Sequence, residues 1–349
     1  MSSQPESLQS PIELIETESA AYNTTLKKVG IRDLSDRGRI CLLGEDRTRF
    51  LHGQVTNDVS GLKPMSGCYA ALVSHKGKME SDLNIVALEN EILLDFESGL
   101  SAQIEERLNH FIIADVVEVV DVAPHYGLVN VMGPAAFDVL RGWKSELARL
   151  EEPYQTIKIG DPDSGEFYVV RNDRVGVEGY DVYIPIAQME GTLRVLEVSV
   201  EKAEGVTVPE RVMEAIRIEH GIPRFGIDMD GSNLAPEAGI ESRAISYAKG
   251  CYIGQEVIAR IRTYGQVAKS LRGLRIEGEQ APAVGAELWN GEKRVGYLTS
   301  VLKSPDLGDW IALGYVRREC NEVGQRLEVS IGEGRGGVEI VQLPFVKKA

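Results

Sequence analysis

The chain has 349 residues, of which 43% are hydrophobic and 26% charged, and its formal net charge is −15. This length exceeds what one hydrophobic core usually supports, so more than one domain is expected. No apolar run reaches the roughly 18 residues of a membrane-spanning helix, so no membrane contact is expected. The negative charge argues against direct binding to nucleic acid. Residues 1–10 carry neither the apolar core of a secretory signal nor the arginines of a transit peptide, which favours a cytoplasmic protein.

The first part of the chain mixes strand and helix patterns. Large apolar side chains recur at helical spacing over residues 46–56 and 101–111. Short apolar runs bounded by polar or glycine residues predict strands. These runs are 39–43, 68–73, 83–88, 91–96 and 115–122. The alternation predicts an N-terminal α+β domain.

A second unit begins near Pro124, and its strand and helix patterns predict a small α+β sandwich. Its predicted strands are 127–132, 167–171 and 180–186, and its predicted helices are 133–150 and 187–203. A further helix, 211–219, follows a segment with capping-box spacing, 207–210, and should end at Gly221.

From Leu271 onward the chain reads as short strands separated by glycine turns. This pattern is typical of a small all-β barrel or sandwich. The predicted strands are 271–276, 287–289, 295–300, 310–315, 326–331 and 337–343. The expected fold class is therefore α+β, with three domains.

The cysteines and histidines give no support for a metal site. Cys41, Cys68, Cys251 and Cys320 are scattered without a CxxC pair, and the five histidines lack metal-ligand spacing. At most one cysteine is therefore expected to have a special role.

The strongest local motif is Lys-Gly-Cys-Tyr-Ile-Gly-Gln-Glu at residues 249–256. Two glycines four residues apart bend the backbone around Cys251, and the ammonium of Lys249 would favour its thiolate form. The alternative is a small packed cysteine in a glycine turn. The residues alone leave both interpretations open.

Two acidic residues stand out elsewhere. Glu219 falls in the last turn of a predicted helix, where the helix dipole disfavours a carboxylate, so it should have a partner. That partner is either Arg217, as in an ordinary ion pair, or a ligand, since a carboxylate can accept two N–H donors from an amino-pyrimidine edge. Asp82 opens a predicted strand next to glycine turns, where it could be catalytic or could simply cap a turn. Asn57 lies in a polar stop after the first helix and could likewise be a capping residue.

These segments occur in a fixed order that resembles the folate-binding YgfZ / glycine-cleavage T-protein family. The matching segments are 33–38, 44–59, 67–82, 217–228, 296–300 and 312–315. The motif at 249–256 is similar to that of the YgfZ branch, whereas aminomethyltransferases carry a related segment without the cysteine. T-proteins also have a pair of aspartates where this chain has Ser81-Asp82, so one carboxylate of the pair is lost and one remains.

The resemblance implies three domains around a central folate cavity. These are an N-terminal folate-binding α+β domain (20–123, completed by 206–265), a ferredoxin-like domain (124–205) and a C-terminal β-barrel (266–349). It implies tetrahydrofolate or a one-carbon derivative as cofactor. The implied function is assistance in synthesis or repair of iron–sulfur clusters, with client proteins or the assembly machinery as partners. The alternative is a folate-dependent aminomethyltransferase of glycine-cleavage type, so the chain's being an enzyme stays open.

The resemblance also assigns expected roles to single residues. Glu219 would anchor the pterin ring, and Asp82 would lie near the reactive N5/N10 edge. Cys251 would place a thiol beside the cavity, held partly as thiolate by Lys249. The remaining expected folate-site residues are Tyr69, Asn57, Tyr252, Gln255 and Glu256.

Overall fold

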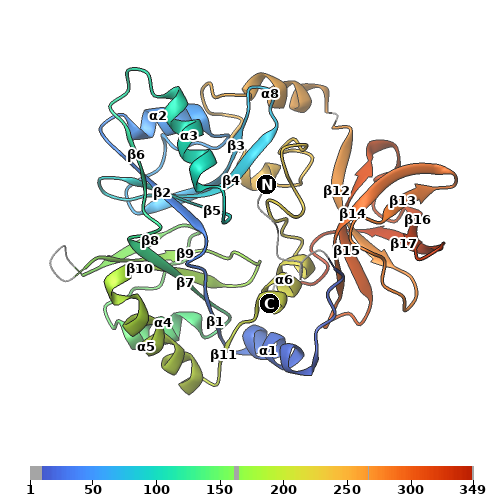
Figure 1. The fold of residues 1–349 in the computed structure, drawn as a ribbon, viewed down its shortest axis with the longest axis horizontal. Helices are drawn as coiled ribbons and strands as arrows, with labels where there is room; N and C mark the ends of the chain where they lie inside the picture. The colour runs from blue at the N-terminus through green and yellow to red at the C-terminus, as the bar shows by residue number, and fades with distance from the viewer. Residues whose placement is uncertain (1–9, 161–164, 266, 348–349) are drawn as a thin grey trace.

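The computed structural model describes residues 10–160, 165–265 and 267–347, which form two sheets and a barrel (Figure 1). The first sheet and its helices, in blue and cyan, lie against the green second sheet, and the orange-red barrel stands beside both. Of the leading segment 1–10, only Ser10 is among the described residues. Within the described ranges, no helix is long and apolar enough to cross a membrane.

The first sheet is antiparallel, with strand order β3-β4-β5-β2-β6. Its strands are β2 (Gly38–Leu43), β3 (Ser66–Val73), β4 (Met79–Ala87), β5 (Ile92–Phe96) and β6 (Glu118–Asp121). Helices α2 (Arg47–Gln54) and α3 (Ser101–Phe111) pack on one face. Because side chains alternate along a strand, Leu83 of β4 points into this core while Asp82 and Asn84 point to the opposite face.

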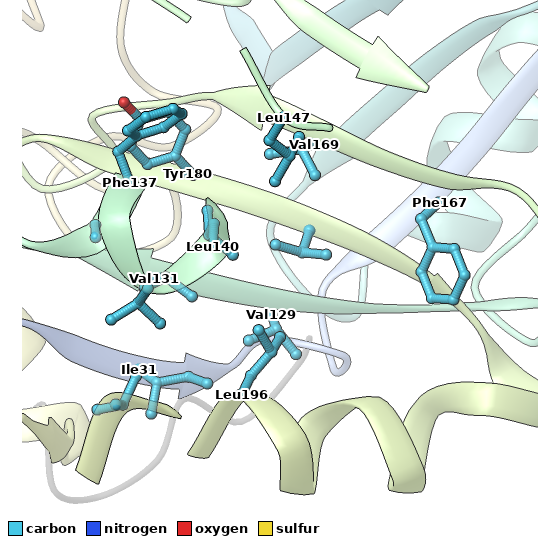
Figure 2. Packing of buried hydrophobic residues seen from close by; sticks show 14 of the residues in the cluster. Ile31, Val129, Val131, Phe137, Leu140, Leu147, Phe167, Val169, Tyr180 and Leu196 are labelled. Carbon is cyan, nitrogen blue, oxygen red and sulfur yellow. The ribbon is translucent and has the colours of Figure 1, made fainter. Parts of the chain in front are cut away.

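The second sheet has the order β11-β1-β7-β10-β9-β8, and only the β1–β11 pair is parallel. Its strands are β1 (Gly30–Asp33), β7 (Tyr126–Met132), β8 (Thr156–Ile159), β9 (Phe167–Arg171), β10 (Gly179–Pro185) and β11 (Val206–Thr207). Helices α4 (Ala136–Trp143) and α5 (Met189–Lys202), the latter preceded by a 3-10 turn (Ile186–Gln188), cover one face. Figure 2 shows this core, where Phe137 of α4 lies beside Tyr180 of β10 with ring centroids 6.1 Å apart.

The barrel is closed, with strand order β12-β15-β14-β13-β16-β17. Its strands are β12 (Lys269–Ile276), β13 (Glu287–Asn290), β14 (Lys293–Lys303), β15 (Trp310–Arg317), β16 (Arg326–Ile331) and β17 (Gly334–Val341), with a 3-10 turn at Arg318–Cys320. Closure pairs every strand, so the barrel has no exposed sheet edge. Its interior is filled by apolar side chains such as Leu288, Leu298 and Val329.

The remaining helices join these units. Helix α1 (Glu16–Lys27) packs on α6 (Glu210–Glu219), and together with one side of the barrel they enclose a shared apolar core. Helices α7 (Glu241–Ala244) and α8 (Gln255–Tyr264) belong to a long segment whose apolar residues pack against β3 and β4. The segment after α6 therefore connects the barrel to the first sheet.

The expected α+β class with a C-terminal barrel is confirmed, while several local predictions are corrected. The helix expected over 133–150 spans only 136–143, because Gly133 has a positive φ of 108° and the backbone is already extended at Lys144. Strand β6 is an edge strand with no fully buried residue, although its valines predicted a buried one. Pro209 lies at the N-cap of α6, and no side chain caps that helix. The domain limits given above stay predictions.

Candidate functional site

A cavity lies where the first sheet, the second sheet, α6 and the segment that follows α6 meet. Its lining is rich in charged and phenolic side chains. Those used in the argument are Tyr69, Asp82, Asn84, Glu97, Tyr154, Arg174, Glu214, Arg217, Arg224 and Arg243. Because these residues come from elements far apart in the chain, the cavity exists only in the assembled fold.

Asp82 presents its carboxylate to this cavity from β4. Its Oδ2 accepts a hydrogen bond of 2.7 Å from the hydroxyl of Tyr69, which lies on the neighbouring strand β3. Its Oδ1 is closed off from solvent and has no hydrogen-bond partner among the described residues. Burial, reinforced by the nearby charge of Glu97, raises the pKa of Asp82 to about 6. The site therefore offers an unused acceptor that changes protonation close to neutral pH.

Two arginines tie the first sheet to its surroundings at one side of the cavity. Arg174 forms ion pairs of 2.8 Å with Asp95 of β5 and 2.7 Å with Asp181 of β10, so it bridges the two sheets. Arg37 pairs with Asp95 at 2.8 Å and with Glu97. Burial alone would raise the pKa of Asp95, but the two guanidinium groups outweigh it and hold that pKa at about 2.

Arg217 and Arg224 form a second paired group on the α6 side. Arg217 contacts Glu214 and Asp228, each at 2.7 Å, and Arg224 contacts Glu214 and Glu97, each at 2.9 Å. Burial opposes ionisation of both carboxylates, but Arg217 and Arg224 lower the pKa of Glu214 overall, and Arg37 and Arg224 lower that of Glu97. Both carboxylates are thus held ionised and occupied by protein partners, unlike Asp82.

Glu219, expected to anchor the pterin, is outside the lining of this cavity. It is fully buried between α1, α6 and the barrel, where its carboxylate accepts hydrogen bonds from Tyr22, Ser304 and the backbone N–H of Asp306. Burial raises the pKa of Glu219. Its oxygens are already engaged, so the pterin role stays a prediction that this placement does not favour.

The 249–256 segment also lies outside the cavity lining. Lys249 is buried, and its ammonium donates to the carbonyl oxygens of His52, Val55 and Asn57 at 2.6–2.8 Å. Burial lowers the pKa of Lys249 to about 8, so the ammonium is still charged at neutral pH. Its three protons are taken by carbonyls, so it anchors the segment to the end of α2, while Cys251 is exposed.

The rest of the segment forms a fixed turn into α8. Tyr252 is buried beneath the Lys249 ammonium, which lies 4.9 Å from the ring centroid. Gly254 has a positive φ of 81°, and a Cβ there would lie 2.5 Å from the carbonyl oxygen of Ser74, so only glycine fits. Gln255 donates to the carbonyl of Gly250 at 3.4 Å, and Glu256 is exposed and pairs with Arg260.

Asn57 has a connecting position. Its side-chain amide donates to the carbonyls of Tyr69 (2.8 Å) and Arg243 (3.0 Å), and so links β3 to α7. Of the predicted site residues, the structure therefore brings only Asp82 and Tyr69 together in the cavity, with Asn57 behind them. Asp82, Glu219 and Cys251 do not face one common cavity.

Sequence reasoning missed several cavity residues. Asn84 could have been found, because it follows Asp82 by two positions on one strand and must share its face. Its side chain accepts a 2.7 Å hydrogen bond from the hydroxyl of Tyr154. Tyr154, a non-glycine residue with a positive φ of 62°, reaches the cavity from an irregular loop that no pattern in the sequence marks.

Comparison with known proteins gives a consistent result. The family model of the GCVT N-terminal domain matches residues 11–249, and that of the glycine cleavage T-protein C-terminal barrel domain matches residues 269–347. The chain is 28% identical over 349 residues to a chloroplastic protein of Arabidopsis thaliana named as a transferase, covering 97% of this chain and 76% of that relative. It is 26% identical over 341 residues to an aminomethyltransferase of Bacillus pumilus, covering 96% and 91% of the two chains.

A solved structure shares the whole fold. The glycine cleavage system aminomethyltransferase T from Bartonella henselae superimposes with a TM-score of 0.86 at 18% identity, covering 98% of this chain and 95% of that one. The two family matches together span both sheets and the barrel. The chain therefore belongs to the glycine cleavage T-protein family, whose members bind tetrahydrofolate and its one-carbon derivatives.

Proposed function

We propose that this protein binds tetrahydrofolate in the Asp82 cavity and promotes transfer of a one-carbon unit to it from an amine, as in aminomethyl transfer of the glycine-cleavage type. The observation that carries this proposal is the state of the Asp82 carboxylate. It has one oxygen held by Tyr69, one oxygen closed off from solvent with no partner among the described residues, and a pKa raised to about 6 by burial. Family membership supports the choice of ligand.

Tetrahydrofolate supplies the ring and bridge nitrogens that accept a one-carbon unit. In its ionised form, Asp82 can accept a hydrogen bond from an N–H of the ligand through Oδ1, and in its protonated form it can hold a proton at that position. Tyr69 fixes the rotamer of Asp82 by donating to Oδ2. The ion-paired arginines around it keep the walls of the cavity rigid, so the carboxylate is positioned before the ligand arrives.

The chain has the residues for one carboxylate at this position and no second one beside it. Ser81 stands where related T-proteins carry the first aspartate, and its side chain is buried on the other face of β4. Loss of that aspartate therefore leaves Asp82 as the acid–base group in the proposal. Glu219, Lys249, Tyr252, Gln255 and Glu256 would act on the ligand only indirectly, through the shape of the fold.

The test is a direct assay under anaerobic conditions. The purified protein is incubated with tetrahydrofolate and a lipoyl-bound aminomethyl donor, and the release of methylene-tetrahydrofolate, ammonia and the free lipoyl thiol is measured. We expect formation above the uncatalysed rate, and loss of that excess in Asp82→Asn. Folate binding without any such formation would instead indicate a folate-storing or scaffolding protein.

A second candidate function rests on the exposed thiol. Lys249 and Tyr252 fasten a turn whose tip displays Cys251 to solvent, as a contact with another protein would require. A single cysteine does not hold an iron–sulfur cluster by itself. We therefore keep as alternative a cytoplasmic, tetrahydrofolate-binding factor that assists synthesis or repair of clusters in client proteins. A Cys251→Ser variant that fully supported cluster enzymes in cells would exclude this alternative.

A further inference from the structure

The arginines that line the Asp82 cavity differ in whether a carboxylate lies beside them. Five of the six have a carboxylate within 4.0 Å, and these are Arg32, Arg37, Arg174, Arg217 and Arg224. Arg243, the sixth, forms no ion pair within the described residues. Its guanidinium instead lies over the ring of Tyr69, 4.9 Å from the centroid. This cation is therefore available to an anion from outside the protein.

The position of Arg243 relative to Asp82 is set by the backbone. Arg243 lies in the short helix α7, where its carbonyl accepts from Asn57 (3.0 Å) and the carbonyl of Ala244 accepts from Thr56 (2.6 Å). These bonds fix α7 against β3, the strand that carries Tyr69. Tyr69 contacts Asp82 through its hydroxyl and Arg243 through its ring, so the two charged groups occupy the same end of the cavity.

The two groups differ in exposure, and this difference shows which of them lies nearer the opening of the cavity. Asp82 Oδ1 is closed off from solvent, whereas Arg243 is exposed although it lines the cavity, so Arg243 marks the opening. Burial raises the pKa values of Tyr69 and Tyr154, and the Arg243 cation opposes both shifts, so it lies close to both phenols. The inner group, Asp82 Oδ1, can accept a hydrogen bond from an N–H, and the outer group, the Arg243 guanidinium over Tyr69, can bind an anion. The two together suit a ligand with nitrogen at one end and a carboxylate at the other.

We propose that Arg243 is a specificity-determining residue that binds a carboxylate of the ligand at the mouth of the Asp82 cavity. This inference rests on the proposed function. A ligand carboxylate has two sources: the glutamate tail of tetrahydrofolate, and a small amino acid that binds beside the folate. Both would be held by paired N–H donors of the planar guanidinium, which a lysine ammonium cannot reproduce in that geometry.

The experiment compares three probes on four proteins. The probes are tetrahydrofolate, tetrahydropteroate (which lacks the glutamate) and N-methylglycine added to the folate-loaded protein. The proteins are the wild type, Arg243→Gln, Arg243→Lys and the matched control Arg262→Gln. Arg262 is also an exposed arginine stacked on a tyrosine, 4.0 Å from the ring of Tyr247, but it does not line the Asp82 cavity. Dissociation constants are measured by anaerobic calorimetry.

We expect Arg243→Gln to weaken tetrahydrofolate roughly tenfold, the effect of one charge-assisted pair at a partly solvated site, and to leave tetrahydropteroate unchanged. Arg243→Lys should recover part of the loss, and Arg262→Gln should match the wild type. A loss confined to N-methylglycine would also support the inference and would assign the carboxylate to the amine. Equal behaviour of Arg243→Gln and Arg262→Gln with all three probes would overturn it. Wild-type protein that bound neither folate would instead contradict the proposed function, and the inference with it.

Discussion

The Asp82 cavity and the 249–256 segment both contain buried charged side chains, but these side chains have different kinds of partner. In the cavity, arginines pair with carboxylates from two sheets and α6, so charge holds separate elements together. In the segment, the ammonium of Lys249 contacts three backbone carbonyls and the ring of Tyr252, and fixes one turn. Within the described residues of the first region, Asp82 Oδ1 has no hydrogen-bond partner and Arg243 has no ion-pair partner, whereas in the second region the Cys251 thiol is exposed. The most recognisable motif of the sequence is thus not part of the cavity lining.

The largest effect is expected where the cavity network is most buried. Arg217→Met leaves Asp228 and Glu214 without their main partner in a site that excludes water. Removing one member of a buried ion pair costs about 3–5 kcal/mol, so the variant should lose most of its stability in urea unfolding. Arg260→Met, in an exposed pair with Glu256, should change the free energy of unfolding by less than about 0.5 kcal/mol. Equal losses in the two variants would mean that the buried network does not hold the cavity together.

A smaller loss is expected from the buried cation of the segment. Lys249→Met removes the donor shared by three carbonyl oxygens, and buried acceptors without partners cost about 1–3 kcal/mol. We expect about 2–3 kcal/mol of destabilisation, with unfolding followed by circular dichroism. Lys76→Met, at an exposed position of the adjacent hairpin, serves as the control. An unchanged unfolding midpoint in Lys249→Met would show that the carbonyls find water and that the segment is not anchored as described.

The ionisation of Asp82 should make both the stability of the protein and its affinity for tetrahydrofolate depend on pH. Burial raises its pKa from the ordinary 3.8 to about 6, so the folded state binds this proton more tightly than the unfolded state. Its contribution to stability is therefore fully present below about pH 4 and falls by about 3 kcal/mol as pH rises to 6. If the ionised form accepts the ligand N–H, tetrahydrofolate affinity should rise through pH 6 and then level off. Calorimetry from pH 5 to 8 should show that rise in the wild type and a flat profile in Asp82→Asn.

The sequence predicted the secondary-structure elements better than it predicted which residues meet in the cavity. The barrel strands and the strands of the first sheet were found because their apolar runs and glycine turns are local signals. The cavity could not be assembled in the same way, because Tyr154, Arg174 and Arg243 are separated by long stretches of chain and have no pattern of their own. Asp82 and Tyr69 were both expected in the folate site from the family resemblance, and the structure places them on neighbouring strands of one hairpin.

The partners of Glu219 could not be predicted from the motif that contains it. A carboxylate at a helix C-terminus needs a partner, and the partners of Glu219 are Tyr22, Ser304 and a backbone N–H. The two protein hydroxyls come from α1 and the loop between β14 and β15, more than 80 residues away in the chain. Only the tertiary structure distinguishes such partners from a ligand. Glu210 and Glu214, earlier on the same helix, are the carboxylates of α6 that line the cavity.

The smallest effect on folding is expected at Cys251. Its thiol is exposed, and no hydrogen bond to it is formed in the described part of the chain, so Cys251→Ser should change the free energy of unfolding by less than about 0.5 kcal/mol. Cys41→Ser is the matched control, because Cys41 is buried in the contact between the two sheets, where a polar hydroxyl costs more to bury than a thiol. Tetrahydrofolate affinity should be the same in Cys251→Ser and the wild type, since the segment does not line the cavity.

If Cys251→Ser weakened tetrahydrofolate binding as strongly as Asp82→Asn, the two regions would form one site, and the thiol would have to reach the ligand by a movement of the 249–256 turn. If affinity were unchanged while support of cluster enzymes in cells was lost, Cys251 would act on a partner protein and the two regions would serve separate steps.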